Sequence, residues 1–221
     1  MKQRRKFLSR PLTTVGAAAA IALASTLAAA VPAIAASIIN DWSTVQVPPP
    51  PKLEPVTINP KTTALLVLDI VKQLCNEKAP RCLATVPQVA KLLQEARANH
   101  MLVVYTLFLG PDQIGDVLPD VKPTGSEPVL RAVPDKFIGT DLEKILKAHH
   151  ITTVIPVGTV ANGAILYTAS HAAQLGFNVV LPVDGMSSQS TYAEQYVAWN
   201  MANAPVIPLH VKLTAVDQMK F

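Results

Sequence analysis

The sequence predicts a single α/β domain in three layers, a doubly wound and mainly parallel sheet with helices on both of its faces. Nearly continuous apolar runs with the length and β-branched content of strands buried on both faces recur along the chain. Segments with the apolar spacing of helices separate these runs, and this alternation favours parallel strands joined by crossover helices. The chain has 221 residues, half of them hydrophobic, which is enough for one substantial core.

The first 35 residues have the anatomy of a secretory signal. A basic start is followed by an alanine-rich apolar stretch and by small residues at Ala33 and Ala35, which predict cleavage after Ala35. Arg4 and Arg5, followed by Lys6, resemble the twin-arginine export signal of bacteria. We expect an exported protein, periplasmic or secreted, with no membrane segment once the signal is removed. The alternative is an uncleaved anchor, but a proline and the cleavage-like triplet end the apolar run.

The charge of the mature chain gives no indication of nucleic-acid binding. The full chain has 19 Lys and Arg residues against 15 Asp and Glu residues. Removal of residues 1–35 takes away five of the basic residues and no acidic one, so the mature net charge is about −1. We therefore expect a small-molecule substrate as partner and no nucleic acid.

Residues 36–60 are predicted to form an extended arm, and residues 61–221 the domain. The arm contains a run of four prolines, which favours polyproline II structure and removes the backbone donors that a sheet needs.

Within the domain, the elements follow one another in a regular order. Strands are predicted at 63–70, 101–108, 152–159 and 178–185, and helices at 85–100, 139–150, 162–176 and 191–204. Thr140 and Glu143 have the spacing of a capping box. Segment 109–134 is rich in Gly and Pro and is predicted to be a loop that serves as a lid or an oligomer contact. The last segment contains Pro208, which belongs at a sheet edge.

Two places at the carboxyl ends of strands, where such sheets bind ligands, carry candidate site residues. Asp69 ends an apolar strand, and a carboxylate there is costly to bury unless it is paired or serves in proton transfer. The alternative is that it caps the following turn. Gly163 and Ala164 lie where a helix begins after Asn162, so their amides suit an oxyanion. Asn-Gly is also common in turns without function.

The order LLVLDI, FIGTDLEKIL and VGTVANGAILYTASHAAQLGFNVVLPVDGMS resembles the isochorismatase-like, or cysteine hydrolase, family over roughly residues 60–210. The resemblance implies a doubly wound α/β fold and a catalytic aspartate at Asp69. The family's nucleophilic cysteine counts to Ala164, which has no nucleophile, so thioester chemistry is not expected there. Relatives commonly form dimers or larger assemblies, and we expect a homo-oligomer.

The resemblance also implies a catalytic lysine and an unusual backbone. Counting back from Thr140 places the lysine at Arg131, and Lys136 stands close by in a slot that relatives fill with a small residue. Arginine does not release its proton, so Arg131 is expected to hold a substrate carboxylate unless it is a solvated loop residue. A cis peptide is expected just before Ala161. The segment of expected substrate-binding residues is Val160, Ala161, Asn162 and Gly163.

Cys75 and Cys82 have six residues between them, which predicts a local disulfide in an oxidising compartment. The alternative is that Cys75 replaces the missing nucleophile. Nicotinamidase-like relatives bind a metal after the second strand, but residues 106–117 contain no His, so we predict no metal and no other cofactor.

Three functions stay open on the sequence alone. The first is hydrolysis of an enol ether by acid catalysis through Asp69, as in isochorismatase, without a thiol. The second is hydrolysis of an amide or related small molecule by water that Asp69 activates. The third is a binding or assembly role in a catalytically degenerate family member.

Overall fold

The computed structural model describes residues 37–110 and 112–221, so the predicted export signal lies outside the described residues. The chain divides into two compact units, residues 1–46 and 47–221. The described part of the first unit contains helix α1 (Ile38–Asp41) and the 3-10 turn Trp42–Thr44. The expectation of an extended arm is therefore wrong for this part, because local bonds such as Asn40 N to Ser37 O (2.9 Å) coil the backbone.

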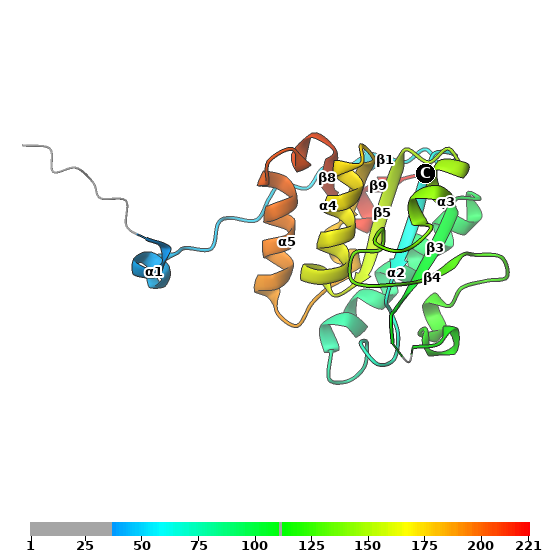
Figure 1. The fold of residues 1–221 in the computed structure, drawn as a ribbon, viewed down its shortest axis with the longest axis horizontal. Coiled ribbons are helices and arrows are strands. Elements are labelled where there is room, and N and C mark those ends of the chain that lie inside the picture. Colours follow the sequence, from blue (N-terminus) through cyan, green and yellow to red (C-terminus); the bar gives the residue numbers. More distant parts are fainter. Residues whose placement is uncertain (1–36, 111) are drawn as a thin grey trace, which may run out of the picture. The chain divides into compact units, whose positions relative to one another are not determined.

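The second unit is built on a parallel sheet, as predicted (Figure 1). Six strands follow the order β4-β3-β2-β5-β6-β8, and β7 pairs with β5. All of these pairings are parallel. The strands are β2 (Thr63–Leu68), β3 (Leu102–Phe108), β4 (Val129–Ala132), β5 (Thr153–Thr159), β6 (Asn178–Pro182), β7 (Met186–Ser187) and β8 (Val211–Thr214).

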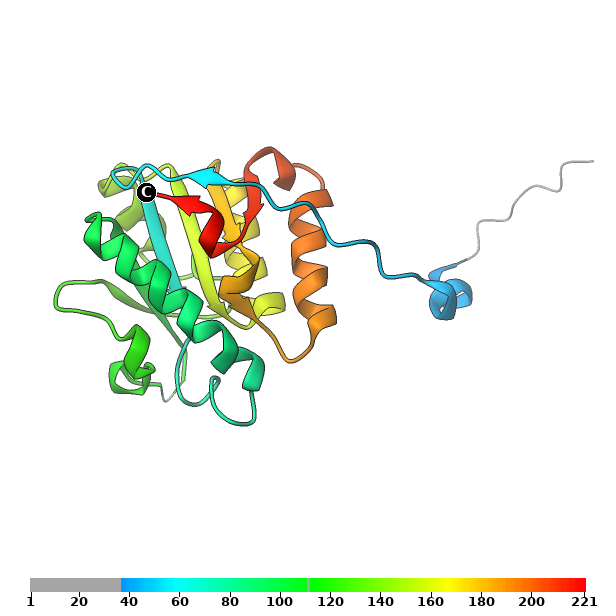
Figure 2. The ribbon, with the colours of Figure 1, turned by 180° about the vertical axis from the view of Figure 1, so that it is seen from behind.

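Helices cover both faces of the sheet. Figures 1 and 2 show α3 (Leu142–Ala148), α4 (Leu166–Gln174) and α5 (Thr191–Asn203) on one face and α2 (Pro80–Ala98) on the other. Strand β2 alternates between the two cores, because Leu66 and Leu68 pack on the α4 side and Leu65 and Val67 on the α2 side. The three-layer α/β prediction is confirmed.

Strand β4 lies inside the segment that was predicted to be loop. It pairs with β3 in the register Tyr105 to Val129 and forms one edge of the sheet. Four residues are too few for a periodic pattern to stand out among the surrounding Gly and Pro residues. The loop prediction is therefore wrong at 129–132.

The end of the arm joins the domain. Strand β1 (Val56–Thr57) pairs in parallel with β9 (Met219–Lys220), and Figure 2 shows the two side by side. Prolines cannot donate to a ladder but can accept, and Pro48 O accepts a bond from Gln195 Nε2 on α5 (2.7 Å). The remaining described elements are short turns, at Ile114–Asp116, Pro119–Val121, Ala161–Ile165, Val183–Gly185, Ile207–Leu209 and Val216–Gln218. Pro208 thus lies in a turn just before edge strand β8.

Helix α3 begins later than predicted, and its capping box is absent. Asp141 precedes the helix and makes no side-chain cap. Thr140 Oγ1 instead donates to Lys136 O (2.6 Å) and accepts from Leu142 N (3.2 Å). Glu143 pairs with Lys147 one turn along the helix. Thr140 consequently links the backbone of Lys136 to the first residue of α3.

Candidate active site

Asp69 lies at the carboxyl end of β2 with its carboxylate turned into the protein, where it is 3% exposed. Its φ angle of 54° is in the left-handed region, which Asp enters more readily than most residues. The backbone is fixed on both sides, because Asp69 N donates to Thr106 O (3.2 Å) and Val71 N donates to Asp69 O (2.9 Å). This turn directs the side chain toward the end of β3.

Two buried side chains bind the Asp69 carboxylate. Thr106 Oγ1 on β3 donates to Oδ1 (2.8 Å), and Lys136 Nζ donates to Oδ2 (2.6 Å). Lys136 is fully buried, and its backbone is held by Thr168 Oγ1, which accepts from Lys136 N (3.2 Å). Buried charges are tolerated when they are paired and hydrogen-bonded in this manner.

Lys136, and not Arg131, is the cation bonded to Asp69 in the structure. Arg131 is exposed on edge strand β4, where its Nη2 donates to Gln113 Oε1 (3.2 Å). Strand β3 lies between β4 and β2, so the register puts Arg131 beside Leu107 rather than beside Asp69. The spacing from Thr140 did not indicate this position of Arg131, because the sequence does not reveal that residues 129–132 form an edge strand.

Burial governs the electrostatics of the site. Desolvation raises the pKa of Asp69 above its ordinary value, which outweighs the lowering by the Lys136 ammonium and by Thr106. The negative charge of Asp112 raises that pKa further. A carboxyl whose pKa is raised while it remains hydrogen-bonded to a cation is suited to donate a proton and then to bear the resulting charge.

Asp112 is a site residue that the sequence analysis missed. It follows β3 in the Gly- and Pro-rich segment and is only 5% exposed. Within the part of the chain that the structure describes, it makes no hydrogen bond or ion pair. The signal in the sequence is an acid in the stretch after Phe108, at the carboxyl end of a strand next to β2.

A glycine brings the turn after β5 against the end of β2. Gly158 has a φ of +125°, and a Cβ there would lie 2.0 Å from Leu68 O. No residue with a side chain fits this close approach. The cis peptide that follows joins Thr159 to Val160, one bond before the expected position.

The predicted substrate-binding turn is a π-helical segment, Ala161–Ile165. Gly163 N donates to Val160 O (3.0 Å), so this amide is not available to an oxyanion as predicted. Asn162 Oδ1 accepts from Ser188 Oγ (2.8 Å). Ala164 is 4% exposed and packs, like Ala161, in the core under α4.

A pocket of about 480 Å³ opens at this edge of the sheet. Thr159, Val160 and Ser188 lie on one side of it, and residues of segment 73–82 on the other. Of the predicted site residues, Val160 lines the pocket, whereas Asp69, Arg131 and Ala164 do not.

The wall formed by segment 73–82 is cross-linked. Cys75 and Cys82 form a disulfide with their Cα atoms 5.2 Å apart, which confirms the predicted pairing. The alternative role of Cys75 as a nucleophile is wrong for this state, because its sulfur is bonded and the residue is 1% exposed.

The comparisons with known proteins agree with this geometry. The isochorismatase domain family matches residues 63–211, which is more than half of the chain. The chain belongs to the isochorismatase family. An uncharacterised isochorismatase family protein of Bacillus subtilis is 26% identical over 174 residues, covering 71% of this chain and 93% of its own length.

Two further relatives of this isochorismatase-family chain are informative. A secreted isochorismatase effector of the fungus Verticillium dahliae is 22% identical over 147 residues, covering 61% of this chain and 77% of its own. The crystal structure of a cysteine hydrolase from Pseudomonas syringae pv. phaseolicola superposes with a TM-score of 0.67 at 20% identity, covering 76% and 95%. At this identity the superposition shows the shared fold alone.

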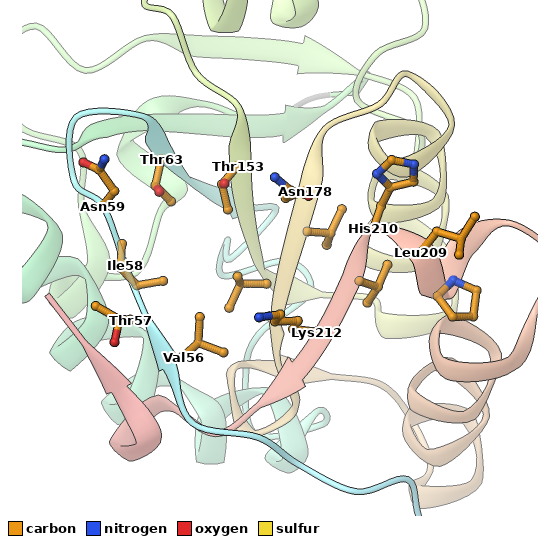
Figure 3. A pocket seen from close by; sticks show the side chains of 14 residues that line it. Val56, Thr57, Ile58, Asn59, Thr63, Thr153, Asn178, Leu209, His210 and Lys212 are labelled. Carbon is orange, nitrogen blue, oxygen red and sulfur yellow. The ribbon is translucent and has the colours of Figure 1, made fainter.

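A second pocket of about 350 Å³ lies at the opposite ends of the strands in this isochorismatase-family domain (Figure 3). Figure 3 shows Asn59 and Thr63 on one side of it and His210 on the other, with Asn178 between them. Thr63 and Asn178 begin strands β2 and β6. This pocket is therefore at the amino ends of the strands, away from Asp69.

Within residues 37–110 and 112–221, no three His, Cys, Asp or Glu side chains gather as a metal site would require. No helix there has the length and apolar character of a membrane span. The absence of a metal or other cofactor stays a prediction.

Proposed function

We propose that this protein is an exported isochorismatase-family hydrolase that cleaves a small molecule without a thiol, with Asp69 as the acid. The observation that supports this best is the buried Asp69 carboxyl, bound by Lys136 Nζ and Thr106 Oγ1 and with its pKa raised by burial. Such a group is protonated at a higher pH than an exposed aspartate, and its cation is in place to stabilise the anion that forms.

Enol-ether hydrolysis is the reaction that uses this chemistry directly. Asp69 gives its proton to the terminal vinyl carbon, which forms a C–H bond and leaves a cationic carbon stabilised by the ether oxygen. Water adds to that carbon, and the hemiketal that results loses the alcohol to give a ketone. The Asp69 carboxylate is held by Lys136 until a proton from the added water restores it.

Ala164 and the disulfide support a route without a thiol. The chain has two cysteines, and both are in the Cys75–Cys82 bond. The position that the family resemblance assigns to the nucleophile is Ala164, which has no group to form a thioester.

The predicted signal in residues 1–35 supports export, and one relative, from a fungus, is a secreted effector. Isochorismate is a cytoplasmic metabolite, so we propose it as a probe of the reaction class and leave the natural substrate as a small molecule met outside the cytoplasm. We also propose that the mature protein is a homo-oligomer.

The test is pyruvate release from isochorismate by the mature protein and by the Asp69→Asn variant. We expect release by the wild type and a loss of about 100-fold or more in the variant. Asp217→Asn is the matched control, because Asp217 is exposed on a turn. Circular dichroism and unfolding midpoints check that the proteins are folded. Release that persists in Asp69→Asn at wild-type rate would sink the proposal.

A binding or assembly role is the second candidate. It is favoured by the burial of Asp69 and Lys136, which are 3% and 0% exposed. Neither residue lines the pocket of about 480 Å³. No pyruvate release from the folded wild type, together with saturable binding of a small molecule, would favour this candidate over the hydrolase.

A further inference from the structure

We infer that the pocket of about 480 Å³ beside Val160 is a subsite for the carboxylate of a small anionic substrate, with Lys78 and Arg81 of the disulfide-closed segment 75–82 as its selecting residues. The inference rests on the proposed function only where it calls the bound anion a substrate. Binding of the anion at this subsite does not depend on whether the protein hydrolyses it.

The charge of the pocket lining is the first argument. Its two charged residues, Lys78 and Arg81, are both cationic, and no acidic residue is in the lining. The other polar residues are neutral and include Gln73, Asn76 and Ser188. Clefts lined by one sign of charge raise the local concentration of ligands of the opposite sign.

The state of Arg81 is the second argument. Glu194 on α5 binds its Nε (2.8 Å) and its Nη2, and Glu194 Oε1 also accepts from Ser188 N (2.9 Å). Glu194 therefore holds the guanidinium by one edge and is itself shared with the backbone. A guanidinium has five N–H donors, so three remain, including both on Nη1, and the Arg81 side chain is 40% exposed.

The position of Lys78 is the third argument. It is exposed and has no ion pair within the described residues, so its ammonium is not neutralised by a neighbour. The disulfide between Cys75 and Cys82 encloses both cations in one short covalent loop. A loop constrained in this way presents its cations with less conformational freedom to lose when a ligand binds.

The pocket is also placed correctly for a substrate. Thr159 ends β5 and Val160 follows it, next to Gly158, which approaches the end of β2 closely. Asp69 follows directly after β2. A carboxylate between Lys78 and Arg81 would leave the rest of a small molecule next to Val160. The subsite then selects the substrate, and the buried pair of Asp69 and Lys136 acts on it.

The experiment measures binding of salicylate and of its neutral amide, salicylamide, by isotope-labelled NMR. The proteins retain Asp69, because salicylate has no enol ether for the proposed reaction to cleave, and the Val160 and Gln189 amides report on the pocket. We expect salicylate to bind more tightly than salicylamide, and Lys78→Gln with Arg81→Gln to weaken salicylate alone by roughly tenfold or more.

Two further variants keep the outcome unambiguous. Lys78→Gln alone removes a cation without an ion-pair partner, so its fold is not at risk, and it should weaken salicylate binding in part. Lys144→Gln, on the exposed face of α3, should leave binding unchanged. Equal affinities for salicylate and salicylamide, or equal losses in the Lys144 control, would overturn the inference.

This design separates the subsite from the proposed hydrolase. Selective carboxylate binding together with no pyruvate release would keep the subsite and remove the hydrolase. Release that depends on Asp69, without selective binding at this pocket, would do the reverse.

Discussion

Two of the ion pairs in the described part of this protein have opposite environments. Lys136 and Asp69 pair with side chains that are 0% and 4% exposed, whereas Arg81 and Glu194 pair with side chains that are 40% and 16% exposed. Both pairs lie near the end of β5 and both join segments far apart in sequence. The two pairs differ in how much solvent reaches their side chains.

Solvent decides what each pair is suited to do. A half-exposed pair contributes little to stability and remains available to a ligand that competes for the cation. A buried pair carries a large desolvation cost, and an apolar pair of similar volume is often as stable or more stable. Retention of Asp69 and Lys136 inside the protein is therefore more easily explained by chemistry than by stability.

The largest effect is expected from breaking the buried pair. Lys136→Met leaves Asp69 without its cation and should lower the free energy of unfolding by about 3–5 kcal/mol, whereas Arg81→Met should lower it by about 1 kcal/mol or less. Urea unfolding of both variants measures the contrast. Lys136→Met combined with Asp69→Leu should recover much of the loss.

Equal losses in the two single variants would contradict this contrast. So would a double variant that is less stable than either single variant, because a buried apolar pair removes the uncompensated charge.

Much of the fold could be predicted from the sequence because its signals are local and repeated. The strands around Leu66 and Val157 are unbroken apolar runs, and α2 has regular apolar spacing. Strand β4 could not be predicted, since its four residues depend on β3 for their pairing.

The candidate site was predictable only where a residue is fixed by its own strand. Asp69 follows directly from the end of β2. Lys136, by contrast, reaches Asp69 from a loop 67 residues away, held by Thr140 and Thr168 through bonds that no sequence spacing reveals. Asp112 was missed because it lies in irregular backbone after β3, where no periodic pattern indicates which way a side chain points.

The second largest effect is expected when a cysteine is placed at Ala164. It tests whether the buried pair of Asp69 and Lys136 can support nucleophilic catalysis by a thiol. Ala164→Cys adds the only free thiol, since the two natural cysteines are bonded to each other. We expect a burst of about one equivalent of p-nitrophenol from p-nitrophenyl acetate, lost when Asp69→Asn is added.

Ala164→Ser is the control of similar size and should give no burst. A burst that survives Asp69→Asn would show that the thiol reacts without the buried pair and would contradict this prediction.

The smallest effect is expected from the second buried carboxylate and is a shift of the pH profile. Asp112 raises the pKa of Asp69, and Lys136 lowers it. If protonated Asp69 is the acid, activity falls as the pH rises through that pKa. Asp112→Asn removes the raising charge, so the midpoint of the fall should move to lower pH, and Lys136→Met should move it to higher pH. Pyruvate release across pH measures both, and shifts in the same direction would exclude Asp69 as the group that sets the profile.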